Sequence, residues 1–108
     1  MEPIERYSWR VVWSPEDGEY VGTCAEFPAL SWLDRSPERA LSGIRHTVTE
    51  CVTDLRRNGE PVPEPIADHR FSGRFMVRVP PRLHRELTVQ AAEAGISLNR
   101  LVTDKLAR

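Results

Sequence analysis

The sequence has few cysteines, two among its 108 residues, and no long apolar run. Cys24 and Cys51 stand apart from any CxxC or Cys/His pattern, which argues against a zinc site and favours free, buried thiols. No stretch approaches the ~18 apolar residues of a membrane span, and the N-terminus lacks a basic segment followed by an apolar one. We therefore expect a cytoplasmic protein with no membrane association, no metal and no cofactor.

Groups arranged for catalysis are also scarce. A two-metal nuclease needs several carboxylates around ions that lie about 4 Å apart, yet residues 7–13, the first predicted strand, contain no Asp or Glu. The nearby carboxylates fall mostly in predicted turns or at element ends: Asp17, Glu19, Glu26, Asp34 and Glu38. His46 lies off the predicted apolar stripe, His84 on a predicted exposed helical face and His69 in a predicted linker. No Ser or Cys has a clear His/Asp partner in sequence. We expect no enzymatic activity and assign no catalytic residue.

The formal net charge of −1 hides two halves of opposite sign. Residues 1–70 carry 8 arginines against 13 acidic residues, a balance of −5. Residues 71–108 carry 6 arginines and 1 lysine against 3 acidic residues, a balance of +4. A basic C-terminal part behind an acidic N-terminal part is compatible with two different charged partners.

Three short strands are predicted in the N-terminal part. Residues 7–13 alternate, which places Tyr7, Trp9, Val11 and Trp13 on one face as a buried row. Ser-Pro-Glu-Asp-Gly over residues 14–18 predicts a turn into a second strand over residues 19–27, which Pro28 should end. Residues 30–33 predict a short third strand.

A long amphipathic helix follows these strands. Ser36 suits the N-cap and Pro37 the first helical position, and Asn58-Gly59 predicts the stop, with Gly59 in the left-handed conformation. The apolar positions recur every three or four residues: Ala40, Leu41, Ile44, Val48, Cys51, Val52 and Leu55. This stripe should pack on the sheet.

The proline-alternating residues 60–65 predict a stiff, extended linker. We place one domain at residues 1–60, the linker at 61–70 and a second domain at 71–108. A fourth short strand within residues 66–70 is left open.

Residues 72–79 read Ser-Gly-Arg-Phe-Met-Val-Arg-Val and alternate. As a strand they put one apolar row opposite a second row of Arg74, Met76 and Arg78. Two short helices follow: the first begins at Pro81 and stops at Gly95, and the second is capped by Ser97. One strand and two helices are too small to bury the apolar row, so we expect a second copy of the chain beside it.

This strand-helix-helix order resembles the ribbon-helix-helix family of DNA-binding domains. In that family two chains pair their strands into a ribbon that enters the major groove, which implies base contacts for Arg74, Met76 and Arg78. Arginine suits guanine, and a methionine tip can touch the thymine methyl group.

The resemblance also implies phosphate contacts at Ser97 and Asn99, at the start of the second helix. The expected dimer core comprises Phe75, Val77, Val79, Leu87, Leu101 and Val102. The plain alternative is an ordinary edge strand with solvated arginines.

Residues 20–28, Tyr-Val-Gly-Thr-Cys-Ala-Glu-Phe-Pro, with Ser-Pro-Glu-Arg-Ala at 36–40 and Asn-Gly-Glu-Pro at 58–61, resemble the HicB antitoxin family. The resemblance implies an α+β fold: a β-β-β-α, partial RNase H-like domain that binds a small, basic, RNA-cleaving HicA-like toxin, then a ribbon-helix-helix domain that represses the operon. Residues 27–31, Phe-Pro-Ala-Leu-Ser, depart from the Leu-Pro-Gly type of turn common in the family. A homodimer is expected, and its pairing into tetramers is left open.

Two other functions stay open at this point. One is a stand-alone dimeric transcriptional regulator whose N-terminal domain senses another protein or a ligand. The other is a residual RNase H-like nuclease, which would require metal-dependent cleavage by the purified protein.

Overall fold

The computed structural model describes residues 3–108 and divides into two compact units, Met1–Phe71 and Ser72–Arg108. We call them the sheet unit and the helical unit, and each is described by itself. The fold is α+β, with a β-β-β-α arrangement in the sheet unit, as the sequence predicts. No helix in the described part of the chain combines the length and apolar character needed to cross a membrane.

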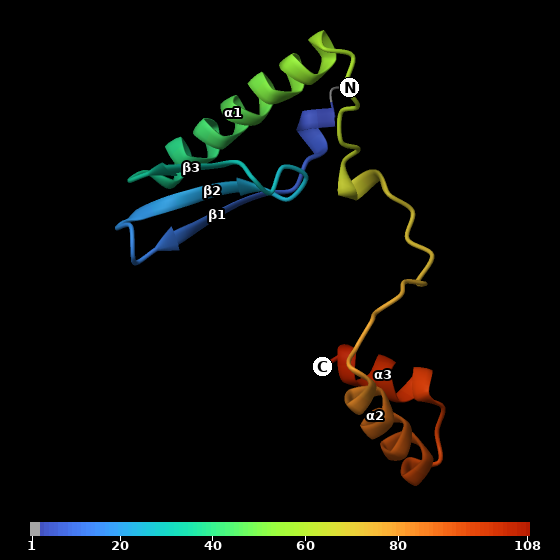
Figure 1. Ribbon diagram of the computed structural model, residues 1–108. Helices are drawn as coiled ribbons and strands as arrows, with labels where there is room; N and C mark the ends of the chain where they lie inside the picture. The colour runs from blue at the N-terminus through green and yellow to red at the C-terminus, as the bar shows by residue number, and fades with distance from the viewer. Residues whose placement is uncertain (1–2) are drawn as a thin grey trace. The chain divides into compact units, whose positions relative to one another are not determined.

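The sheet unit contains one antiparallel sheet in the order β1-β2-β3 (Figure 1). After a 3-10 turn at Pro3–Arg6 come β1 (Trp9–Ser14), β2 (Glu19–Cys24) and β3 (Ser31–Asp34). The three predicted strands are confirmed, although β2 ends before Pro28 because a turn closes at Phe27, whose amide donates to the Cys24 carbonyl over 3.0 Å. Gly18 has a φ of 65°, a left-handed value that favours glycine in the predicted hairpin.

Helix α1 (Pro37–Arg57) covers one face of this sheet (Figure 1). The Ser36 hydroxyl accepts from the Arg39 amide over 3.3 Å, and Gly59 has a φ of 69° just beyond the helix; the predicted cap and stop are therefore confirmed. The α1 residues that are buried share one stripe: Ala40, Ile44, Val48 and Val52. Leu41, predicted to belong to this stripe, is exposed instead.

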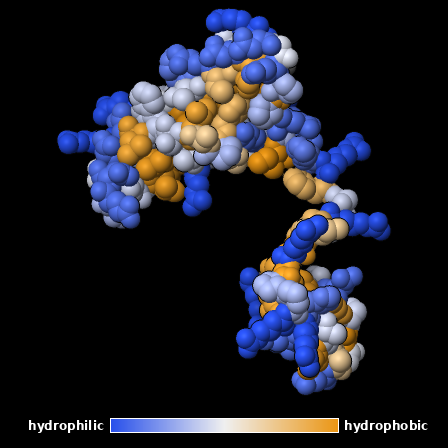
Figure 2. Space-filling model, in the orientation of Figure 1, coloured by the Kyte–Doolittle hydropathy of each residue, from blue (hydrophilic) through white to orange (hydrophobic). Residues whose placement is uncertain are grey.

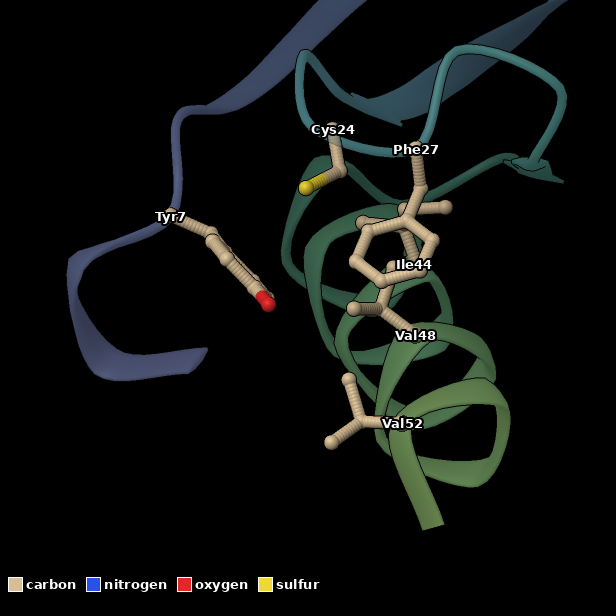
Figure 3. Close-up of a cluster of buried hydrophobic side chains, with 6 residues drawn as sticks. All are labelled: Tyr7, Cys24, Phe27, Ile44, Val48 and Val52. Carbon is tan, nitrogen blue, oxygen red and sulfur yellow. The ribbon is translucent and has the colours of Figure 1, made fainter. Parts of the chain in front are cut away.

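The core lies between α1 and the ends of β1 and β2. Six side chains converge there (Figure 3): Tyr7, Cys24, Phe27, Ile44, Val48 and Val52. The Tyr7 and Phe27 rings meet edge to face with centroids 5.5 Å apart. The predicted buried row of residues 7–13 is only partly right, because Trp13 is 52% exposed. It stands at the hairpin end, where the Tyr20 ring is its edge-to-face neighbour.

The proline-rich segment packs on the sheet unit. We call residues 62–68 the strap. The Tyr7 hydroxyl donates to the Pro63 carbonyl over 2.7 Å, the Ile66 amide donates to the Glu26 carboxylate over 2.9 Å, and Arg6 pairs with Asp68 at 3.0 Å. Residues Ile66–Asp68 form a 3-10 turn, and residues 66–70 contain no fourth strand.

The helical unit consists of α2 (Pro81–Ala94) and α3 (Leu98–Leu106), which pack against each other. Gly95 ends α2 with a φ of 69°, and the Ser97 hydroxyl caps α3 by accepting from the Arg100 amide over 3.0 Å. Both predicted boundaries are confirmed. Ala91 is the one buried residue along the two helices, all of which are described. A single helix pair therefore leaves most of its apolar surface in water.

Candidate nucleic-acid and dimerisation interface

The segment at residues 73–79, predicted to be a strand, contains no strand in the single chain. It follows an open path into α2 (Figure 1), and all of residues 71–80 are exposed. The physical reason is that a β-strand is defined by its ladder of hydrogen bonds, and no second strand exists in this unit for it to pair with. We call residues 73–79 the ribbon segment.

A turn at Ser72 and Gly73 precedes the ribbon segment. The Arg74 amide donates to the Ser72 hydroxyl over 3.0 Å, and Gly73 has a φ of 83°, which L side chains rarely adopt. The alternating pattern predicts Gly73 only as part of the strand. A serine followed by glycine is a turn signal that could have revealed this bend.

An open groove of about 920 Å³ lies within the helical unit, between the ribbon segment and the two helices. Five of the six predicted dimer-core residues line it: Phe75, Val77, Val79, Leu87 and Val102. Leu101, the sixth, is half-buried and is not part of the lining. Leu98 and Leu106 of α3 add further apolar surface.

The apolar side chains of the ribbon segment are unusually exposed. Phe75 is 76% accessible and Val77 63%. Figure 2 shows such apolar surface beside strongly polar surface in this unit. A soluble chain rarely leaves contiguous apolar side chains uncovered, so this groove marks an interaction surface.

The predicted base-contacting residues lie on the same segment. Met76 is 86% exposed, and Arg74 and Arg78 border the groove with no ion pair to any residue within 3–108. In the single chain the two predicted rows are therefore not yet separated onto opposite faces. Only pairing into a strand would separate them.

The predicted phosphate-contacting residues lie at the start of α3. The Ser97 oxygen is engaged by the Arg100 amide, while Asn99 is exposed and borders the groove. The first turn of a helix presents unpaired amides and the positive end of the helix dipole. This geometry suits a phosphate, with the Ser97 hydroxyl proton still available to donate.

His84 also lines the groove, which the sequence analysis did not foresee. It precedes Leu87 by three positions on α2 and so shares its side of the helix. The three-residue spacing from a predicted core position was the signal available in the sequence.

Two carboxylates of the sheet unit, those of Glu26 and Asp34, are engaged in structural contacts. Burial opposes ionisation of Glu26, but the Ile66 and Ser8 amides outweigh it and lower the pKa of its carboxyl group. The Ser36 amide and the Arg39 guanidinium lower the pKa of Asp34. Within residues 3–108, no three His, Cys, Asp or Glu side chains gather where they could hold a metal ion.

The two cysteines are free thiols. Burial is the main cause that raises the pKa of Cys24 to about 11. A thiol with so high a pKa is a poor nucleophile at neutral pH, in agreement with its predicted role as a core residue.

These features define a two-unit α+β chain whose second unit combines a basic, alternating segment with an incompletely buried helix pair. The model of the HicB family matches residues 58–106, which span the whole proline-rich segment, the ribbon segment and both α2 and α3, so the resemblance to this family is confirmed over that range. Among the motifs that suggested the family, only residues 58–61 lie within the match. No curated protein and no solved structure matched the chain.

Proposed function

We propose that this protein is a dimeric antitoxin that neutralises a small, basic, HicA-like toxin through its sheet unit and represses its own operon through its helical unit. The HicB-family match supports a role related to toxin-antitoxin systems. The observation that carries the DNA-binding half is the exposed apolar groove beside two arginines without ion pairs.

Pairing of two ribbon segments would remove the instability of the single helical unit. Burying one large apolar side chain contributes roughly 1.5–3 kcal/mol, and the two copies together offer six such side chains from Phe75, Val77 and Val79. The same pairing would complete the backbone hydrogen bonds that one segment cannot make. Dimerisation and strand formation would therefore occur together.

In the paired ribbon, Arg74, Met76 and Arg78 would project from the face opposite the apolar row. A two-stranded ribbon fits the major groove, and arginine can donate two hydrogen bonds to guanine. The start of α3, with Ser97 and Asn99, would hold the backbone phosphates. Two copies related by a two-fold axis would recognise a palindromic operator.

The test compares Arg74→Ala and Arg78→Ala with the matched control Arg82→Ala, an exposed arginine on α2. Each of the first two changes should weaken specific binding to the operon's own promoter by about 1–3 kcal/mol, measured by fluorescence anisotropy at fixed salt. The control should lose less, and all variants should retain toxin neutralisation. Unchanged promoter affinity in the Arg74/Arg78 double variant would refute the DNA-binding assignment.

A stand-alone transcriptional regulator remains the second candidate. One observation favours it: the family match starts at residue 58 and leaves the three strands and all of α1 outside. The gene next to this one separates the two candidates. A small basic protein that binds the sheet unit supports the antitoxin, and its absence supports the regulator.

A further inference from the structure

The sheet has one face that nothing in its unit covers. An added Cβ at Gly22 would come within 2.5 Å of the Ala40 carbonyl oxygen, so Gly22 faces α1. Side chains alternate along a strand, and Val21, the neighbour of Gly22, therefore points to the opposite face. Figure 1 shows α1 on the first face and no element of this unit on the second. We call the second face the open face.

A row of branched aliphatic residues crosses all three strands of the open face. Val21 is the register partner of Val12 on β1 and of Leu33 on β3. Val12 and Leu33 are each 40% exposed. The uncovered face of an antiparallel sheet is ordinarily polar, so an aligned apolar row there indicates a contact surface.

Uncompensated negative charge adjoins this row. Glu16 and Asp17 lie in the β1–β2 turn, and Glu19 is paired in register with Ser14 on the open face. None of these three carboxylates forms an ion pair with a residue in the described range.

Several other acidic residues of the sheet unit have a basic partner close by. Asp34 pairs with Arg39 and Asp68 with Arg6, and Glu5 pairs with Arg45. Arg10 is the one basic side chain on the strands of the open face, in register with Thr23 and therefore two residues from the apolar row. The hairpin end therefore carries three carboxylates that have no basic partner within residues 3–108.

We propose that the open face and its acidic hairpin are the docking surface for a basic protein, with the row of Val12, Val21 and Leu33 as the apolar centre. The proposal rests on the proposed antitoxin function and assigns its partner contact to one face of the sheet. Charge complementarity selects a basic partner over a second copy, because a two-fold contact would place two sets of acidic hairpins in one interface.

The apolar centre is tested with Leu33→Lys and the matched control Leu41→Lys, an exposed leucine on α1. The probe is the purified basic protein encoded beside this gene, titrated calorimetrically against the full-length chain. Leu33→Lys should weaken binding by at least about tenfold, since a charge at an interface centre is poorly tolerated. Leu41→Lys should change it less than about threefold. Circular dichroism establishes that both variants are folded.

The acidic hairpin is tested with the triple variant Glu16→Gln, Asp17→Asn and Glu19→Gln. Its association rate with the same probe should fall about tenfold at low salt and depend less on ionic strength. A rate and salt dependence equal to those of the wild type would overturn the steering role of the hairpin.

Hydrogen exchange of the wild-type complex locates the contact without any substitution. Protection confined to β1–β3 supports the proposal, whereas protection confined to the outer side of α1 overturns it.

Equal binding of Leu33→Lys and wild type to the probe also overturns the proposal, although the antitoxin function would stand. If the wild-type chain does not bind the probe, the proposed function itself fails. If size measurements show that Leu33→Lys instead disrupts a self-association of the chain, the occupant is a second copy and the proposal is wrong.

Discussion

At Gly22 and Gly43 the sheet and α1 leave no room for a side chain. A Cβ at Gly22 would lie 2.5 Å from a backbone oxygen of α1 and 2.9 Å from Ile44. A Cβ at Gly43 would collide with the ring of Trp32. Neither glycine has a left-handed φ. Their role is therefore to leave room for packing and not to permit a turn.

Gly22→Ala should destabilise the sheet unit by about 1–3 kcal/mol, because the obstructing atom belongs to the helix backbone and cannot rotate away. Urea denaturation followed by circular dichroism measures the change. Gly18→Asn is the matched control, since Gly18 has open space around it and asparagine tolerates its left-handed φ. Equal stability of Gly22→Ala and wild type would show that α1 can shift away from the sheet at little cost.

At the scale of elements, the sequence predicted what depends on local chemistry. The cap at Ser36, the turn at Gly18 and the stop at Gly95 follow from residue types at fixed offsets. The exposure of Trp13 and the docking of the strap could not be predicted, because both depend on where distant segments pack. The candidate site divides in the same way: the alternation of residues 72–79 predicts its ribbon residues, but the groove depends on how α2, α3 and the ribbon segment pack.

Glu26 is the residue that holds the strap. Its carboxylate accepts from the Ser8 amide over 2.8 Å and from the Ile66 amide over 2.9 Å. Glu26→Gln removes the charge and replaces one of the two acceptor oxygens with an NH2 group that cannot accept, so it should cost about 1–3 kcal/mol and speed hydrogen exchange at the Ile66 amide. Glu64→Gln is the control, because this side chain is exposed and its carboxylate lies 3.4 Å from the Nε2 atom of His69. Unchanged exchange at Ile66 would contradict the role of Glu26.

The contact between Glu26 and the strap also makes the stability of the sheet unit depend on pH. Because the pKa of Glu26 is lowered in the fold, the stability it contributes is complete above the ordinary glutamate value of 4.5 and is lost as pH falls through the lower, folded value. Wild type should therefore lose more stability in acid than Glu26→Gln does. Parallel losses in the two proteins would mean that other carboxylates dominate the acid response.

At the scale of the whole molecule, the two units differ in how they are stabilised. The sheet unit has a contiguous core, whereas the helices of the other unit bury only Ala91. About 37 residues without a disulfide or metal lie near the lower limit for independent folding. A second copy on the groove would supply the missing core, and it would do so only at sufficient protein concentration.

Thermal unfolding should therefore occur in two steps that respond differently to concentration. We expect the helical unit to melt first, with a midpoint that rises by several degrees over a hundredfold increase in protein, since ligand-linked stabilisation grows with the concentration of the binding partner. The sheet unit should melt at a constant temperature. Phe75→Ser should lower the first midpoint and leave the second unchanged, because Phe75 lines the groove of the helical unit alone. Scanning calorimetry at two protein concentrations measures both midpoints. If the melting midpoint of the helical unit does not depend on concentration, the helical unit is stable without a second copy.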